Sequence, residues 1–98
     1  HFVTAFRYLN EHNQIVEGSS DDGEPRGSSG RPTLKTLQGA NLINVGIVTV
    51  RYFGGILLGV GGLVKAYSDV ANLAISNATL IEYKDVFEFS FSVDYNKT

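Results

Sequence analysis

The fold is decided by the stretch VGIVTVRYFGGILLGVGGLVKAY, residues 45–67. Residues 45–53 are nearly all apolar or β-branched, and this pattern predicts a central strand covered on both faces. A glycine-rich loop follows at 54–62, and after Gly62 apolar residues recur at helical spacing. The inward face of this long helix is predicted to carry Leu63, Ala66, Tyr67, Val70, Leu73, Ala74 and Ala78.

The flanking segments complete an α+β pattern. Residues 2–9 alternate and predict a strand, and Ile15 and Val16 pair back on it as a short hairpin strand. Residues 17–31 form a polar loop, 32–38 a short helix, and 86–95 a last strand. This order predicts a two-layer α+β domain with helices packed on a mainly antiparallel sheet.

Composition limits the classes of function. The chain has 98 residues, a net charge of −2, no Cys and no Met. An anion site must therefore be a local cluster of cations, because the overall charge does not attract nucleic acid or anionic membranes. The chain has neither a membrane-spanning run nor a signal peptide, so we expect a cytoplasmic protein. It begins at His1 within an apolar stretch, and we expect it to be part of a longer protein.

The glycine-rich segment is a candidate anion site. A strand, a glycine loop and a helix together present backbone N–H groups and a positive helix dipole to an anion. Arg51 and Lys65 flank this segment and add charge. Alternatively, the glycines permit tight turns and close packing of the helix on the sheet. The candidate glycines are Gly54, Gly55, Gly59, Gly61 and Gly62. We expect the long helix to begin at Gly61 and Gly62, with free N–H groups that face an anion or a carboxylate of the acidic loop. Gly61 would permit the close approach of that group.

The polar loop contains an acidic motif formed by Ser20, Asp21, Asp22 and Glu24, together with Arg26 and Arg31. Its carboxylates could bind a metal or act in acid–base chemistry. Alternatively, they pair with Arg26, Arg31 or Arg51 and pin the loop to the sheet. No base partner for a serine nucleophile is evident, so we assign no catalytic residue. We also assign no metal and no cofactor. We expect residues 19–31 to be ordered and to pack beside 51–55.

Two motifs, in order and at matching spacing, resemble the signature of the YigZ/IMPACT family, named for its Impact N-terminal domain. They are SDDGEP at 20–25 with Gly27, Gly30 and Pro32, and RYFGG at 51–55 with LG at 58–59, GGL at 61–63 and AY at 66–67. The resemblance covers about residues 1–80. The sequence departs from the usual family residues at Arg26, Ser28-Ser29 and Lys65.

The resemblance implies a fold like the second domain of a small-subunit ribosomal protein. It implies an Impact-type domain over residues 1–82, and a strand at 83–98 leading toward a ferredoxin-like domain outside the chain. Eukaryotic relatives regulate translation by competing for a scaffold that activates an initiation-factor kinase, and nucleic-acid binding has been suggested for bacterial ones.

Two functional hypotheses follow. The first is a non-catalytic module of translation control that binds RNA or a ribosome-associated protein, with Tyr52, Phe53 and Tyr67 available to stack on bases. The alternative is an enzyme that acts on a phosphorylated small molecule through the glycine-rich loop. The sequence favours the first and leaves catalysis open.

Overall fold

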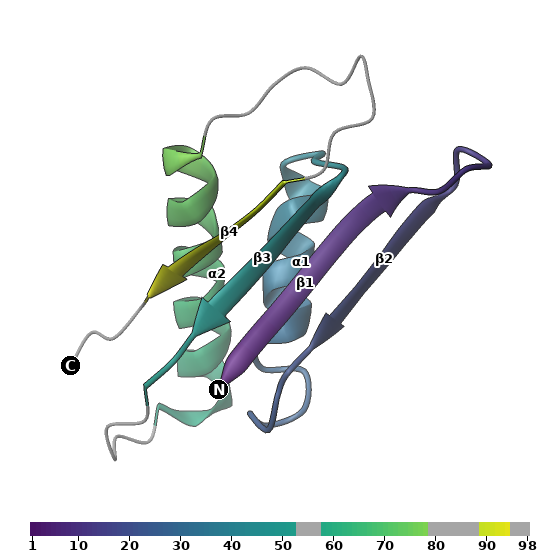
Figure 1. Ribbon diagram of the computed structural model, residues 1–98. Helices are drawn as coiled ribbons and strands as arrows, with labels where there is room; N and C mark the ends of the chain where they lie inside the picture. Colours follow the sequence, from purple (N-terminus) through teal and green to yellow (C-terminus); the bar gives the residue numbers. More distant parts are fainter. Residues whose placement is uncertain (53–57, 79–88, 95–98) are drawn as a thin grey trace.

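The computed structural model describes residues 1–52, 58–78 and the course of the strand at 89–94, and it confirms the α+β class (Figure 1). A sheet with strand order β2-β1-β3-β4 forms one layer. β1 is antiparallel to both β2 and β3, whereas β4 runs parallel to β3. The elements in chain order are β1 Phe2–Leu9, β2 Ile15–Ser20, α1 Gly30–Gly39, β3 Val45–Val50, α2 Gly59–Asn77 and β4 Phe89–Asp94.

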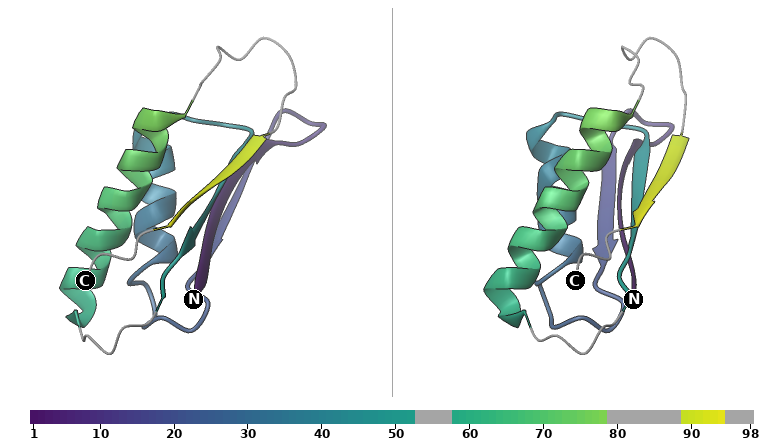
Figure 2. Two further views of the ribbon diagram at one scale, coloured as in Figure 1. Left: turned by 60° about the vertical axis from the view of Figure 1, so that its left-hand side comes forward. Right: turned by 90° about the vertical axis from the view of Figure 1, so that its left-hand side faces the viewer.

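The two helices form the second layer, on one face of the sheet (Figure 2). Both begin at the end of the domain where β1 begins, so they run side by side in the same direction (Figures 1 and 2). No helix in the described ranges combines the length and apolar character that a membrane crossing requires.

The side chains of β1 alternate between buried and exposed positions, as the sequence predicts. Val3, Ala5 and Arg7 are buried, while Phe6 and Tyr8 belong to the exposed set. The Phe6 and Tyr8 rings stack with centroids 5.9 Å apart. β1 therefore contributes its small apolar residues to the core and its aromatic rings to the open face.

β2 is longer than the predicted hairpin strand, because it continues through residues 17–20, which were assigned to the loop. These residues are polar, but β1 offers each a partner in register. Glu17 lies opposite Arg7 and accepts a hydrogen bond of 2.8 Å from its Nε. Gly18 lies opposite Phe6, whose ring would be 2.8 Å from an added Cβ. Cross-strand pairing thus overrides local composition.

β3 is shorter than predicted, and the expectation of burial on both faces is wrong for it. The strand ends at Val50; Arg51 and Tyr52 lie beyond it, and Phe53 is outside the described residues. Ile47 and Thr49 are buried, whereas Val48 and Val50 are only partly buried. The physical reason is that both helices cover the same face.

Both helices begin earlier than predicted. α1 begins at Gly30 and not Pro32, and α2 begins at Gly59, so Gly61 and Gly62 lie in its first turn. Leu73 was expected to point inward but is 49% exposed. The residues of α2 that are buried are Leu63, Tyr67, Val70, Ala71 and Ala74.

In the described part of the chain, buried apolar residues form two clusters. The larger joins Ala5, Leu37, Val45, Ile47 and Ala71 between the sheet and both helices. The smaller joins Val3, Leu63 and Tyr67. The Tyr67 hydroxyl donates a hydrogen bond to Glu24, so the smaller cluster connects the core to the acidic motif.

Candidate functional site

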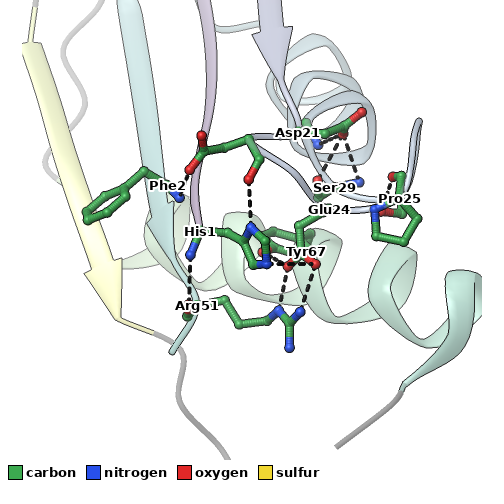
Figure 3. Close-up of polar contacts among 11 residues, drawn as sticks. His1, Phe2, Asp21, Glu24, Pro25, Ser29, Arg51 and Tyr67 are labelled. Carbon is green, nitrogen blue, oxygen red and sulfur yellow. Dashed lines mark hydrogen bonds and ion pairs between the residues drawn. The ribbon is translucent and has the colours of Figure 1, made fainter. Parts of the chain in front are cut away.

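The acidic motif lies in the loop between β2 and α1, at the end of the domain where both helices begin (Figures 1 and 3). Glu24 is its most buried acid, with a side chain only 1% exposed. Arg51 engages both carboxylate oxygens of Glu24, through Nε and, at 2.7 Å, through Nη2. Tyr67 donates to the same carboxylate at 2.6 Å, and the His1 Nε2 lies 3.7 Å away (Figure 3). Glu24 therefore connects the N-terminal residue, α2 and the segment after β3.

The electrostatics of this cluster favour the charged carboxylate. Burial by itself raises the pKa of Glu24, but hydrogen bonds from Arg51 and Tyr67 outweigh it and lower the pKa below its ordinary value. The pKa of Arg51 is raised by its hydrogen bonds to Glu24. Burial and the bond to Glu24 raise the pKa of Tyr67, so the hydroxyl stays protonated and donates. The three groups form one satisfied ionic network.

Asp21 closes the N-terminus of α1 from outside the helix. Its Oδ2 accepts the Gly27 N–H at 2.9 Å, and its Oδ1 accepts the Gly30 N–H at 2.8 Å. Oδ1 also accepts both the backbone N–H and the hydroxyl of Ser29, at 3.3 and 2.9 Å. Burial raises the pKa of Asp21, but these hydrogen bonds outweigh it and the pKa is lowered. Asp21 thus satisfies amides that a helix N-terminus leaves unpaired, which explains why α1 begins at Gly30.

Asp22 and Ser20 hold the other side of the loop. Asp22 adopts a φ of 45° and its Oδ2 accepts the Phe2 N–H at 2.6 Å. Its carbonyl oxygen lies 2.6 Å from His1 Nδ1, and its own N–H donates to Ser20 Oγ at 3.2 Å. Each residue of the predicted acidic motif therefore contacts the chain itself, and the motif pins the loop to β1.

Gly30 allows this loop to pack closely. A Cβ added at Gly30 would lie 2.8 Å from the carbonyl oxygen of Ser20. Backbone atoms cannot move aside as a flexible side chain can, so only glycine fits where α1 begins against the end of β2.

The structure confirms some of the predictions about the site residues and not others. The interpretation that Glu24 anchors an arginine is confirmed, and with it the packing of the loop beside Arg51. Asp22, by contrast, bonds to backbone. Lys65 forms an exposed ion pair with Asp69 at 2.7 Å. An added Cβ at Gly61 would meet open space, so the described chain does not approach this residue closely, and the close approach of an anion there stays a prediction. Gly54 and Gly55 lie outside the described residues.

The aromatic residues that were predicted to stack on bases also differ from one another in exposure. Tyr67 is 2% exposed, so it is a core residue and not a stacking surface. Tyr52 is 62% exposed, and Phe53 lies outside the described residues. The helical period already places Tyr67 inward, and a buried tyrosine hydroxyl requires a partner. This signal could have identified Tyr67 as a partner of the acidic motif; the role of His1 has no such signal.

The cations of the loop and of α1, unlike Glu24, lie at the surface. Arg26, Arg31 and Lys35 are all exposed. Arg31 and Lys35 line a groove of about 570 Å³ between the two helices. Sequence reasoning missed both the groove and Lys35. We call this feature the interhelical groove; its lining residues are Gly27, Arg31, Pro32, Lys35, Thr36, Gly39, Ala40, Val64, Ser68 and Asn72.

A metal centre finds little support in the ranges 1–52 and 58–78. Within the described residues, His, Asp and Glu side chains do not gather in groups of three or more that could hold an ion. The carboxylates of Asp21 and Glu24 already accept several hydrogen bonds each.

The comparisons with known proteins identify the family. The profile of the Impact N-terminal domain matches residues 1–75, so the chain belongs to the IMPACT family. IMPACT family member YigZ of Escherichia coli (strain K12) is 44% identical over 80 residues, which are 82% of this chain and 39% of that protein. IMPACT family member YvyE of Bacillus subtilis (strain 168) is 36% identical over 88 residues, covering 90% of this chain and 41% of that protein.

A eukaryotic relative matches a shorter region. Protein IMPACT-B of Xenopus tropicalis is 40% identical over 60 residues, which cover 60% of this chain and 18% of that protein. The chain thus spans about two fifths of the length of its bacterial relatives, given 39% and 41% coverage. Whole-protein activities of these relatives do not transfer to it directly.

Proposed function

We propose that this domain is a non-catalytic binding module that acts in translation control in the cytoplasm, through RNA or a ribosome-associated protein. The observation that carries the proposal is the division of charge within the loop between β2 and α1 and the first turn of α1. Asp21 and Glu24 are engaged by the chain itself, whereas Arg26 and Arg31 face solvent. An inward acidic side stabilises the loop and an outward basic side is available to a polyanion.

The same division disfavours the enzyme hypothesis. A general base must come within hydrogen-bond reach of the proton it removes. Glu24 is 1% exposed and already accepts hydrogen bonds from Arg51 and Tyr67. Its lowered pKa makes it a poor base near neutral pH. The role in translation is supported by the family resemblance, which implies such a role for eukaryotic relatives.

Binding of the 98-residue chain to a fluorescently labelled single-stranded RNA tests the proposal. Anisotropy titrations between about 50 and 200 mM salt should give an affinity that falls with salt, because each neutralised phosphate releases counterions. Arg26→Gln should weaken binding, and Gln14→Glu is the matched control, since it lowers the net charge equally in the turn between β1 and β2. Absence of RNA binding together with absence of co-sedimentation with ribosomes would overturn the proposal.

A further inference from the structure

Two regular rows of residues, one on each helix, are among those that line the interhelical groove. Arg31, Lys35 and Gly39 follow one another at intervals of four along α1. Val64, Ser68 and Asn72 do the same along α2. Residues four apart lie on one face of a helix, about 6 Å apart along its axis. The two helices run side by side in the same direction (Figure 2). The two rows therefore line opposite walls of the groove.

The charge of the groove is one-sided. Arg31 and Lys35 give its α1 wall two cations, and among the described lining residues there is no acid. On the α2 wall, Ser68 and Asn72 are polar and uncharged. The chain as a whole carries −2, so this concentration of positive charge is local.

The six arginines and lysines among the described residues fall into two groups: three pair with an acid, while Arg26 and the two groove cations do not. Arg7 pairs with Glu17, Arg51 with Glu24 and Lys65 with Asp69. In the ranges 1–52 and 58–78, Arg31 and Lys35 make no ion pair with an acid. Within the described residues, the groove therefore holds two of the three arginines and lysines that no acid neutralises, the third being Arg26.

The position of these cations opposes the stability of their own helix. Arg31 lies in the first turn of α1, where the helix dipole favours negative charge, and Lys35 lies in the second turn, where this effect is weaker. They are also like charges four residues apart, which repel. A local arrangement that costs stability without an internal partner is typical of a functional site. A bound anion would relieve both conflicts.

We propose that the interhelical groove binds phosphate groups of an RNA strand, with Arg31 and Lys35 as the charged donors and Ser68 and Asn72 on the facing wall. The choice of RNA rests on the function proposed above; the phosphate chemistry rests on the groove itself. Phosphate is favoured because guanidinium and ammonium groups both donate charge-assisted hydrogen bonds to its oxygens. The strand would lie along the helices, since the two cations follow the groove.

The test combines location, affinity and stability. Amide chemical shifts of the 98-residue chain are titrated with a short single-stranded RNA and, separately, with inorganic pyrophosphate. Both should shift residues 31–40 and 64–72. In the Arg31→Gln/Lys35→Gln variant, RNA affinity should fall about ten-fold and the salt slope should decrease by about 1.4, the value for two phosphates on a single strand. The melting temperature should be unchanged or higher, because cations that oppose the dipole are removed.

The possible outcomes test the groove proposal and the proposed function separately. Gln14→Glu should leave RNA affinity and shifts unchanged, and a loss equal to that of the double variant would overturn a specific groove. If the wild type binds RNA and the double variant binds equally well, the groove proposal fails and the proposed function stands. If pyrophosphate shifts the groove residues but RNA does not bind, RNA is overturned as the ligand in favour of a phosphorylated small molecule. If neither probe binds, the groove proposal fails, and co-sedimentation with ribosomes then decides the proposed function.

Discussion

Replacing Glu24 by Gln tests the anchor of the acidic motif. The change keeps the side-chain shape but removes the charge that Arg51 engages twice and Tyr67 once. Breaking a buried ion pair costs about 3–5 kcal/mol, because the remaining charge loses its partner. The Arg51 side chain is 17% exposed, so water solvates part of it. We therefore expect the free energy of unfolding to fall by about 3 kcal/mol, at the lower end of that range.

That loss is large enough to measure and small enough to leave a folded protein. A domain of this size has a free energy of unfolding of about 5–15 kcal/mol. A change of 1 kcal/mol shifts the melting temperature by about 4–8 °C, so Glu24→Gln should melt about 12–24 °C lower. Urea unfolding at a fixed low temperature gives the free energy directly, and thermal melting gives the midpoint.

A double-mutant cycle tests whether the loss of stability comes from the Glu24 network or from a general disruption of the fold. Tyr67→Phe removes only the hydroxyl, and its loss should be about 1–2 kcal/mol. The cost of Tyr67→Phe should be smaller when Glu24 is already Gln, because the charged acceptor is gone. Glu11→Gln is the matched control, since its side chain is 86% exposed and the change should stay within about 0.5 kcal/mol. An unfolding free energy of Glu24→Gln equal to that of Glu11→Gln would refute the reasoning.

Three further predictions follow from the same region. Gly30→Ala should destabilise by about 1–3 kcal/mol in urea unfolding, because its Cβ would lie 2.8 Å from the Ser20 carbonyl oxygen; an unchanged midpoint would contradict the close approach. Gly61→Ala should instead stabilise by about 0.5–1 kcal/mol, since its Cβ meets open space in the first turn of α2; a lower midpoint would indicate a hidden contact. Stability should fall with acid: Asp21 and Glu24 have lowered pKa values in the fold, so the stability they add is present above their ordinary values of 3.8 and 4.5 and is lost as the pH falls through the lower folded values. Asp21→Asn should flatten that acid dependence, and a pH profile identical to wild type would contradict the role of its carboxylate.

The sequence predicted most of the elements because their patterns are local. Residues 2–9 alternate, and residues after Gly62 repeat at helical spacing, so periodicity alone locates β1 and most of α2. It failed at residues 17–20, where strand formation depends on pairing with β1 and not on composition. It also failed at Leu73, because a helix that covers one face of a sheet buries a narrower stripe than its apolar pattern suggests.

The sequence located the candidate site, but it did not predict the role of each residue in it. The motif residues identified the loop, and the pairing of an acid with Arg51 was one of the open interpretations. Which acid forms the pair depends on the path of the loop, which reverses at positive-φ positions such as Asp22 and Gly23. The interhelical groove was not predictable, because it requires α1 and α2 to run in the same direction and side by side. Local sequence patterns do not predict how the two helices are arranged relative to each other.

The RNA affinity of Glu24→Gln, measured at a temperature where the variant is fully folded, tests the central claim most directly. That claim is that the acidic motif stabilises the loop while exposed cations bind the partner. The account predicts RNA affinity within about two-fold of wild type, a difference of about 0.4 kcal/mol, despite the loss of stability. A folded Glu24→Gln protein with affinity reduced about ten-fold or more would contradict it, because the carboxylate would then act on the ligand itself.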